Sequence, residues 1–131
     1  MARKVKMYTS YYASQKIRNQ NLQLVQISVS LPKDMHYRKD IWNFDEAKPD
    51  WDTVDKIKKG IYTEGDYYAE YMRKLFNNKP IIAKKLVDFY HQANGKNIVF
   101  LCYEAPNKFC HRHIFAEFCN KLFTNLNIQE L

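Results

Sequence analysis

The apolar run at residues 98–103, IVFLCY, constrains the fold of this chain more than any other stretch. It has the length of a β-strand, and an apolar strand without polar alternation is typical of a parallel sheet that is covered on both faces. It is also the longest apolar run in the chain, far shorter than the roughly 20 residues that a membrane-spanning helix requires. The sequence therefore predicts a buried parallel strand here and no membrane partner.

Periodic patterns around this run predict the other elements. Alternating basic and apolar residues favour a first strand at 4–9, and a β-like stretch at 22–31 is closed by Pro32, which cannot continue a strand ladder. Apolar residues at three- and four-residue spacing predict four helices, at 51–60, 67–76, 80–93 and 114–126. The last residues, 127–131, favour a short edge strand.

Strands that alternate with helices imply parallel pairing and right-handed crossovers. We therefore expect residues 1–131 to form a single α/β domain, a small Rossmann-like three-layer sandwich with a mostly parallel four-stranded sheet. The simplest strand order is 2-1-3-4, which places a topological switch between the first strand and the apolar strand. Residues 33–60 form a long, partly irregular insertion, and such segments commonly cover a site or are mobile.

Charge and cysteine content limit the partners and the setting. The chain has 21 Lys plus Arg against 14 Asp plus Glu, a formal charge of +7 and a pI near 9.3. An anionic small molecule or a nucleic acid therefore fits as a partner. A positive net charge can equally have no role beyond keeping a protein soluble. Three cysteines and a start, MARKVKMYTS, without an apolar leader predict a reducing, cytoplasmic setting. The assembly state is not specified.

Chemically reactive residue types gather just after the apolar strand. Cys102 and Glu104 close the strand, and Cys110 and His111 open the next helix, so we take these four as candidate catalytic residues. A thiol at a helix N-terminus has a lowered pKa, and the same backbone N–H groups attract an anion. If Cys110 and His111 both lie in the first turn, however, their side chains project about 100 degrees apart, which disfavours a dyad.

The predicted switch brings the end of the first strand to the same place. We expect five residues to contact a ligand there: Thr9, Ser10, Tyr11, Tyr103 and Arg112. Arg112 supplies a fork of donors that matches phosphate or carboxylate. The alternative is structural: Arg112 pairs with Glu104 across the loop, and Cys110 packs inward as free cysteines usually do.

Four residues near the strand end offer soft metal ligands: Cys102, Cys110, His111 and His113. Structural zinc modules usually show ligand pairs two to four residues apart at each end, whereas Cys102 stands alone. The two histidines would also point about 200 degrees apart on a helix. The spacing therefore predicts no metal, and nothing in the sequence indicates a cofactor.

The segment LCYE, followed after a short loop by CHR, resembles the domain-of-unknown-function family 488, in which Leu-Cys-x-Glu precedes Cys-His-Arg. TSYY near the start, PDW at 49–51 and the helix YYAEYMRKL support the resemblance. It implies a compact Rossmann-like α/β domain. The matching residues are Cys102, Glu104, Cys110, His111 and Arg112. Many members look as if they carry an acidic residue and an arginine after the second strand, where this chain reads ISVSLPK, so Ser28, Ser30 and Lys33 replace that pair only in part.

Two functions remain open from the sequence. In the first, the domain binds an anionic nucleotide or a nucleic-acid-related ligand at a cleft formed by the Cys-Glu and Cys-His-Arg residues, with or without catalysis. In the second, it is a non-catalytic module that binds a protein or nucleic acid, and the motif is a structural network. In that case the aromatic segment 37–51 and the basic surface contact the partner.

Overall fold

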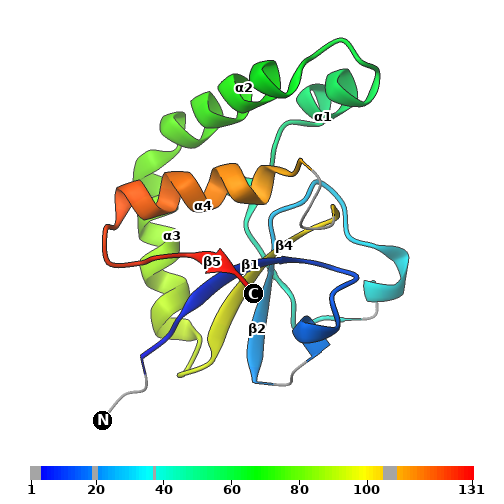
Figure 1. Cartoon of the computed structure of the whole chain (residues 1–131). Coiled ribbons are helices and arrows are strands. Elements are labelled where there is room, and N and C mark those ends of the chain that lie inside the picture. The colour runs from blue at the N-terminus through cyan, green and yellow to red at the C-terminus, as the bar shows by residue number, and fades with distance from the viewer. Residues whose placement is uncertain (1–3, 19–20, 37, 105–108) are drawn as a thin grey trace.

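The computed structural model describes residues 4–18, 21–36, 38–104 and 109–131. Its strands are β1 (Met7–Tyr11), β2 (Leu22–Gln26), β3 (Trp42–Asn43), β4 (Asn97–Cys102) and β5 (Gln129–Glu130). Within the described ranges they form one five-stranded parallel sheet in the order β3-β2-β4-β1-β5 (Figure 1). The α/β class and the Rossmann-like parallel sheet are confirmed, with one strand more than predicted.

Strand β4, the apolar run, lies at the centre of the sheet between β2 and β1. The predicted order, in which the first strand separates the second from the apolar strand, is therefore wrong. The physical reason is burial: all residues from Ile98 to Cys102 are buried, and the central position is the one covered on both faces and both edges. Strands β1 and β4 are nevertheless neighbours, and Tyr11 lies opposite Cys102.

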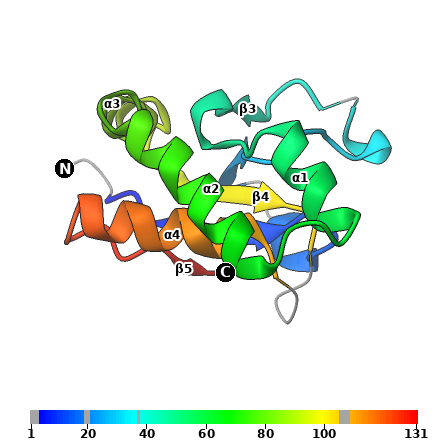
Figure 2. The same cartoon turned by 90° about the horizontal axis from the view of Figure 1, so that it is seen from above.

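The helices are α1 (Trp51–Lys58), α2 (Glu64–Asn77), α3 (Lys79–Gln92) and α4 (His111–Leu122). They contribute to the apolar cluster on one face of the sheet, and α2 lies over α4 (Figure 2). Helix α2 begins three residues earlier than predicted because Thr63 and Asp66 form a capping box, each side chain accepting the other's backbone N–H. Helix α3 is followed by Asn94 and Gly95 in the left-handed region, as predicted for its end.

The opposite face of the sheet is covered by two short 3-10 segments, η1 (Gln15–Arg18) and η2 (Lys33–Met35). The chain therefore leaves β1 toward η1 on this face, whereas it leaves β4 toward α4 on the helical face. Because β1 and β4 are adjacent, the predicted topological switch between them is confirmed. The switch opens at the carboxyl ends of the strands, where α/β sheets bind ligands.

The described part of the segment 33–60 contributes to the sheet and to the core. Besides η2 and α1 it contains β3, which pairs with β2, and η3 (Asp45–Ala47). Phe44 is fully buried and its ring contacts those of Phe89, Phe100 and Phe115. Residue 37, where the predicted aromatic surface begins, and residues 105–108 of the loop after β4 lie outside the described residues.

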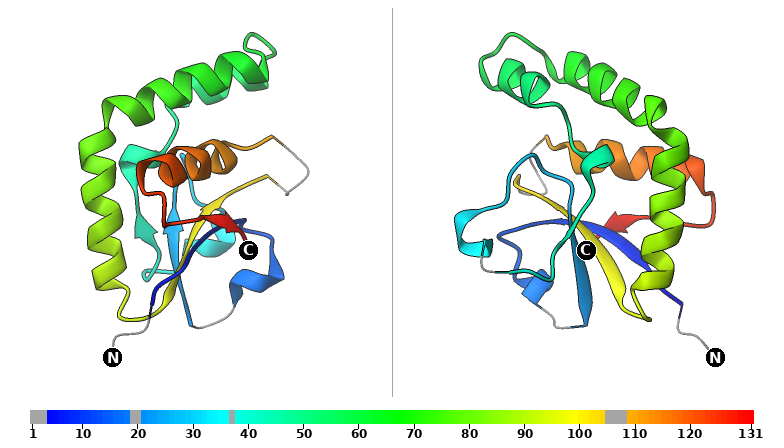
Figure 3. Two further views of the ribbon diagram at one scale, coloured as in Figure 1. Left: turned by 60° about the vertical axis from the view of Figure 1, so that its left-hand side comes forward. Right: turned by 180° about the vertical axis from the view of Figure 1, so that it is seen from behind.

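The C-terminal strand β5 lies beside β1 at the edge of the sheet (Figure 3). Its position is held by hydrogen bonds that reach back to Asn120, whose side chain bonds both N–H and C=O of Ile128. In the part of the chain that the structure describes, no helix is both long and apolar enough to cross a bilayer.

Candidate functional site

Arg112 lies wholly inside the protein, with none of its surface exposed. Its Nε and Nη2 each donate to the Glu130 carboxylate at 3.0 Å, so the two side chains form a bidentate ion pair. Its Nη1 donates to Cys102 Sγ at 3.1 Å and to the backbone carbonyl oxygen of Glu104. Each guanidinium nitrogen therefore has a partner within the fold, and no anion from solvent reaches it.

Strand β1 completes this network around Arg112. Thr9 Oγ1 donates to Glu130 Oε1 at 2.8 Å, and the Tyr11 ring centroid lies 5.7 Å from the guanidinium carbon. We call Thr9, Tyr11, Cys102, Arg112 and Glu130 the sealed network. It joins β1, β4, α4 and β5, so its charges serve to hold the sheet edge and the last helix together.

The sealed network corrects several predictions. Thr9, Tyr11, Cys102 and Arg112 do meet, as predicted, but in the interior rather than at a cleft, so the anion-binding role of Arg112 does not fit its burial. The carboxylate that pairs with Arg112 belongs to Glu130, and Glu104 contributes only its carbonyl oxygen. Ser10 points to the opposite face, where its buried Oγ has no hydrogen-bond partner among the described residues.

The sulfur atoms of Cys102 and Cys110 are joined in a disulfide. Both residues are buried, and neither is a free thiol in this form, so neither acts as the nucleophile that the sequence predicts. The other cysteine, Cys119, is free and packs in the core. Burial raises the pKa of its thiol, which makes it an unreactive hydrophobic side chain.

His111 is the first residue of α4 and is also buried. Its Nε2 lies 2.6 Å from the carbonyl oxygen of Ile27, which only accepts, so Nε2 carries the proton. Its Nδ1 faces Cys110 Sγ at 3.9 Å. Burial lowers the pKa of His111 to about 4, so the ring is neutral near pH 7.

The backbone at Cys110 explains why these two side chains meet. Cys110 is the N-cap of α4 and has an extended conformation, with φ −151° and ψ 144°. The prediction that Cys110 and His111 diverge assumed that both lie in the first helical turn. Because Cys110 precedes the helix, its sulfur turns back toward Cys102 and approaches the imidazole. The ligand atoms of Cys102, Cys110 and His111 consequently lie within 4.8 Å of one another.

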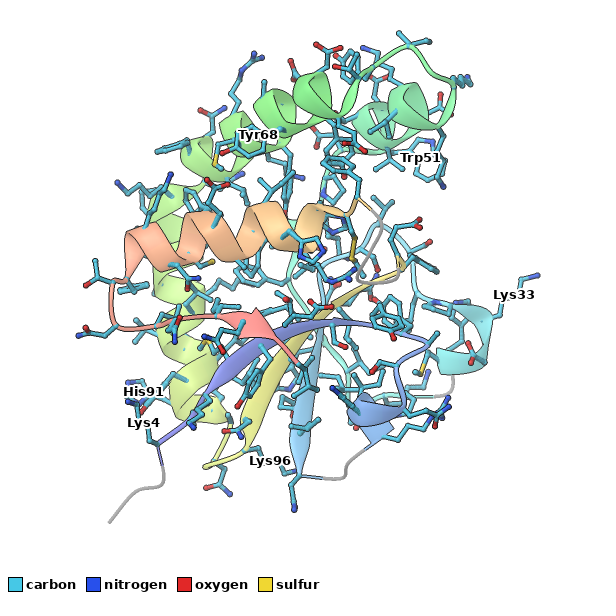
Figure 4. The ribbon with its side chains drawn as sticks, in the orientation of Figure 1. Lys4, Lys33, Trp51, Tyr68, His91 and Lys96 are labelled. Atoms are coloured by element: carbon cyan, nitrogen blue, oxygen red, sulfur yellow. A yellow bond between two sulfur atoms is a disulfide. The ribbon has the colours of Figure 1, made fainter. Side chains whose placement is uncertain are left out.

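A cavity of about 740 Å³ opens beside these residues, outside the carboxyl ends of β2 and β4. We call it the switch pocket. Its sheet side is lined by Ser28, Ser30, Tyr103, Glu104, Phe109, Cys110 and His111, and its helical side by Trp51, Val54, Ile57, Lys58, Tyr62, Glu64 and Tyr67. Trp51 projects from α1 on the helical side (Figure 4). Four predicted site residues, Tyr103, Glu104, Cys110 and His111, therefore share one open pocket.

The family models, the curated proteins and the solved structures contain no match to this chain. The resemblance to family 488 remains a prediction.

The wall of the switch pocket nearest β2 is fixed by hydroxyl groups. Tyr12 bonds Ser28 Oγ at 2.7 Å, Ser28 Oγ donates to the carbonyl oxygen of Ser30, and Ser30 Oγ bonds the Tyr103 hydroxyl at 3.1 Å. Burial raises the pKa of Tyr12, so its hydroxyl remains neutral. Where the family 488 pattern is expected to have an acid and an arginine, this protein has a neutral series of hydrogen-bonded hydroxyl groups that holds Tyr103.

Sequence reasoning missed the helical side of the switch pocket. The sequence places Trp51 in an amphipathic helix and at the end of the aromatic segment 37–51, and no local pattern indicates that α1 packs across from the end of β4. A second cavity of about 730 Å³ lies at the amino end of the sheet, near Lys4 and His91 (Figure 4). None of the predicted site residues lines it.

Proposed function

We propose that the switch pocket binds an anionic ligand of nucleotide or nucleic-acid type. A flat base would lie against Trp51 or Tyr103, and a phosphate would lie near Lys58 and the start of α4. The observation that carries the proposal is the placement of exposed aromatic rings and a helix N-terminus around one cavity outside the carboxyl ends of β2 and β4, the side of the sheet on which α/β proteins bind ligands. The proposal does not use Arg112.

The aromatic lining supports recognition of a base. Trp51 is 60% exposed and Tyr103 is 44% exposed, although both line a concave surface. Exposed aromatic rings of this kind bind bases by stacking, which tolerates different bases because each presents a flat π-face. Glu104 and Glu64 also line the pocket and would accept hydrogen bonds from amino or hydroxyl groups of such a ligand.

The charge distribution supports an anionic group on the ligand. Lys58 Nζ lies 5.8 Å from the centre of the Trp51 ring, so a phosphate attached to a stacked base would be within its reach. The N-terminus of α4 carries a positive partial charge at the same pocket. The net charge of +7 favours approach of a polyanion over the whole surface.

We extend the proposal to membership of family 488 and to a reducing, cytoplasmic setting. The five matching motif residues support the first, since Glu104, Cys110 and His111 line the switch pocket. Cys102 and Arg112 lie behind them, bonded to Cys110 and to the backbone of Glu104. The proposal assigns no bond-making step to the disulfide form, in which the predicted nucleophiles Cys102 and Cys110 are joined to each other. In a reducing setting this bond would open and both thiols would be free.

Calorimetric titration with a panel of nucleotides and short oligonucleotides tests the proposal. Trp51→Ala should weaken binding by about 5- to 100-fold, because stacking of one base is worth about 1–3 kcal/mol. The matched control is Ile81→Ala, which removes an exposed apolar side chain from α3, outside the pocket. Equal binding by wild type and Trp51→Ala, or no binding by wild type at either low or physiological salt, would refute the proposal.

A second candidate function is a non-catalytic interaction module, and the sealed network favours it. Because Arg112 holds the fold rather than a ligand, part of the motif is structural, and the exposed aromatic residues with the basic surface would contact a macromolecule. The salt dependence of RNA or DNA binding separates the two candidates. Lys58→Ala should reduce the salt slope by about one unit if this lysine contacts a phosphate, whereas Lys84→Ala on α3 should not.

A further inference from the structure

Three soft ligand atoms converge at the inner wall of the switch pocket: Cys102 Sγ, Cys110 Sγ and His111 Nδ1 lie within 4.8 Å of one another. We propose that reduction of the Cys102–Cys110 bond converts this cluster into a site for one divalent ion of the Zn²⁺ class, held by two thiolates and one imidazole. Thiolate sulfur and imidazole nitrogen are the ligands that Zn²⁺ prefers. The inference does not depend on which ligand occupies the pocket.

His111 is already oriented as a metal ligand. Its Nε2 donates to the carbonyl oxygen of Ile27 at 2.6 Å, so the free lone pair belongs to Nδ1, the atom that faces Cys110 Sγ. A ligating histidine almost always donates its other ring N–H to a carbonyl or carboxylate, which fixes the ring and its tautomer. The edge-on contact with the buried Tyr71 ring further restricts rotation of the imidazole.

The two sulfurs have surroundings that favour thiolates. Arg112 Nη1 donates to Cys102 Sγ at 3.1 Å, while the Glu130 carboxylate balances the other side of the guanidinium. Cys110 is the N-cap of α4, where the positive end of the helix stabilises a nearby anion. Arg112 therefore acts as an outer partner of the site, a positioning residue that holds one sulfur without touching the ion.

The backbone spacing accommodates an ion between the sulfurs. With Zn–S near 2.3 Å and Zn–N near 2.0 Å, tetrahedral ligand atoms stand about 3.5–3.8 Å apart, and Cys110 Sγ and His111 Nδ1 are separated by 3.9 Å. The Cα atoms of Cys102 and Cys110 are 7.3 Å apart, wider than the roughly 4.4–6.8 Å usual for disulfides.

Three protein ligands leave the fourth position for the switch pocket, which Cys110 and His111 both line. Sites with three protein ligands and one open position are typical of zinc that meets water or a substrate rather than of closed structural zinc. His113, the fourth ligand weighed from the sequence, is exposed and does not belong to this cluster. The spacing argument against metal included His113 as a fourth ligand, which the proposed site does not use.

The chemistry balances with a phosphine reductant. The phosphine gives up two electrons and takes the oxygen atom of one water molecule, so it becomes a phosphine oxide. The disulfide accepts the two electrons, and with the two protons of that water it becomes two thiols. Binding of the divalent ion then displaces one proton from each thiol. Metal binding should therefore release two protons per chain at a pH where both thiols are protonated.

Cobalt titration of the full chain under anaerobic conditions tests the site, because Co²⁺ reports thiolate ligation by charge-transfer absorption and tetrahedral geometry by its visible bands. We expect the phosphine-reduced protein to bind one Co²⁺ per chain, Zn²⁺ to displace it, and the oxidised protein to show no such bands. The comparison of reduced and oxidised wild type requires no substitution, so it remains decisive if a variant fails to fold.

Variants then identify the ligands. Cys110→Ser and His111→Gln should each weaken Co²⁺ binding by more than about 100-fold, since loss of an outer partner alone typically costs 10- to 100-fold. The matched controls His113→Gln and Cys119→Ala should bind as wild type does, with folding checked by circular dichroism. Reduction without cobalt bands would show a redox-active disulfide only and refute the metal site. So would equal bands in the oxidised protein, or loss of the bands in His113→Gln with retention in His111→Gln.

Discussion

The sealed network and the switch pocket share the end of one strand and the start of one helix, yet they have opposite characters. Cys102 and Arg112 turn inward, where each polar atom finds a partner, while Cys110 and His111 reach the wall of an open cavity. Neighbouring residues of a short motif thus divide between holding the fold and forming a site. A compact motif in a sequence need not act as one unit.

The largest expected effect lies in the sealed network. Glu130→Gln removes the charge that balances Arg112, and an uncompensated buried cation should lower the free energy of unfolding by about 3–5 kcal/mol. Urea unfolding followed by circular dichroism measures it. Glu117→Gln, which breaks an exposed pair with Lys121, is the control and should cost less than about 1 kcal/mol. Similar losses in both variants would contradict the inward role of Arg112.

His111 sits between the two regions and should give the stability a pH dependence. Its pKa is about 4 in the folded chain, below the ordinary 6.5, because burial disfavours the imidazolium. In the oxidised, metal-free protein the full stability is therefore present above pH 6.5, falls as the unfolded chain takes up a proton, and stops falling near pH 4. The loss should be about 3 kcal/mol.

His111→Gln isolates this contribution from that of other groups. Its unfolding free energy should change less between pH 7 and pH 4 than that of wild type, as measured by urea unfolding at several pH values. His113→Gln is the control for a neighbouring, exposed histidine. Parallel pH profiles for wild type and His111→Gln would show that the imidazole is accessible to protons in the folded chain.

Substitution in the switch pocket should weaken ligand binding but leave the stability of the fold almost unchanged. Because Trp51 is 60% exposed, Trp51→Ala should change the free energy of unfolding by no more than about 0.5 kcal/mol, even though it is expected to weaken nucleotide binding. Glu130→Gln, once folded, should retain binding. Thermal melts and calorimetry on the same samples compare the two. A Trp51→Ala protein that melts as early as Glu130→Gln would remove the distinction between the regions.

The smallest effect concerns the hydroxyl chain at the pocket wall. Tyr103→Phe deletes one partially exposed hydrogen bond to Ser30 Oγ and keeps the ring. Stability should change by at most about 0.5 kcal/mol, and binding by no more than a few fold, while Tyr103→Ala should cost more because the stacking surface is lost. If the two variants bind equally, the Tyr103 ring does not contact the ligand.

Local periodicity predicted the elements that are long enough to show it. The buried strand β4, the helices α2, α3 and α4, and the adjacency of β1 and β4 all follow from patterns that repeat over several residues. The two-residue strand β3 shows no period and was missed. The edge strand at 127–131 was predicted and is seen as β5, but the role of Glu130 in it was not predicted. The strand order depends on which strand is most buried relative to the others, a property of the whole sheet.

Prediction of the site failed where it required pairing in space. Nothing in the spacing of Cys102 and Cys110 distinguishes a sulfur bond from two packed thiols, and the extended backbone at Cys110 decides its direction. Burial of Arg112 likewise depends on β5 folding back over it, which no pattern within the motif indicates. The sequence therefore indicated that residues at the strand end and the helix start lie together, as the structure has them, but it did not indicate their division between interior and pocket.

The central place of β4 also bears on how the chain folds during synthesis. Strand β1 hydrogen-bonds to β4 and β5, both of which come from the last third of the chain, so it has no strand to pair with until residues 97–102 have left the ribosome. Such long-range closure slows folding and leaves an exposed strand edge on the nascent chain. Fragments that stop before Asn97 should aggregate rather than form a smaller sheet.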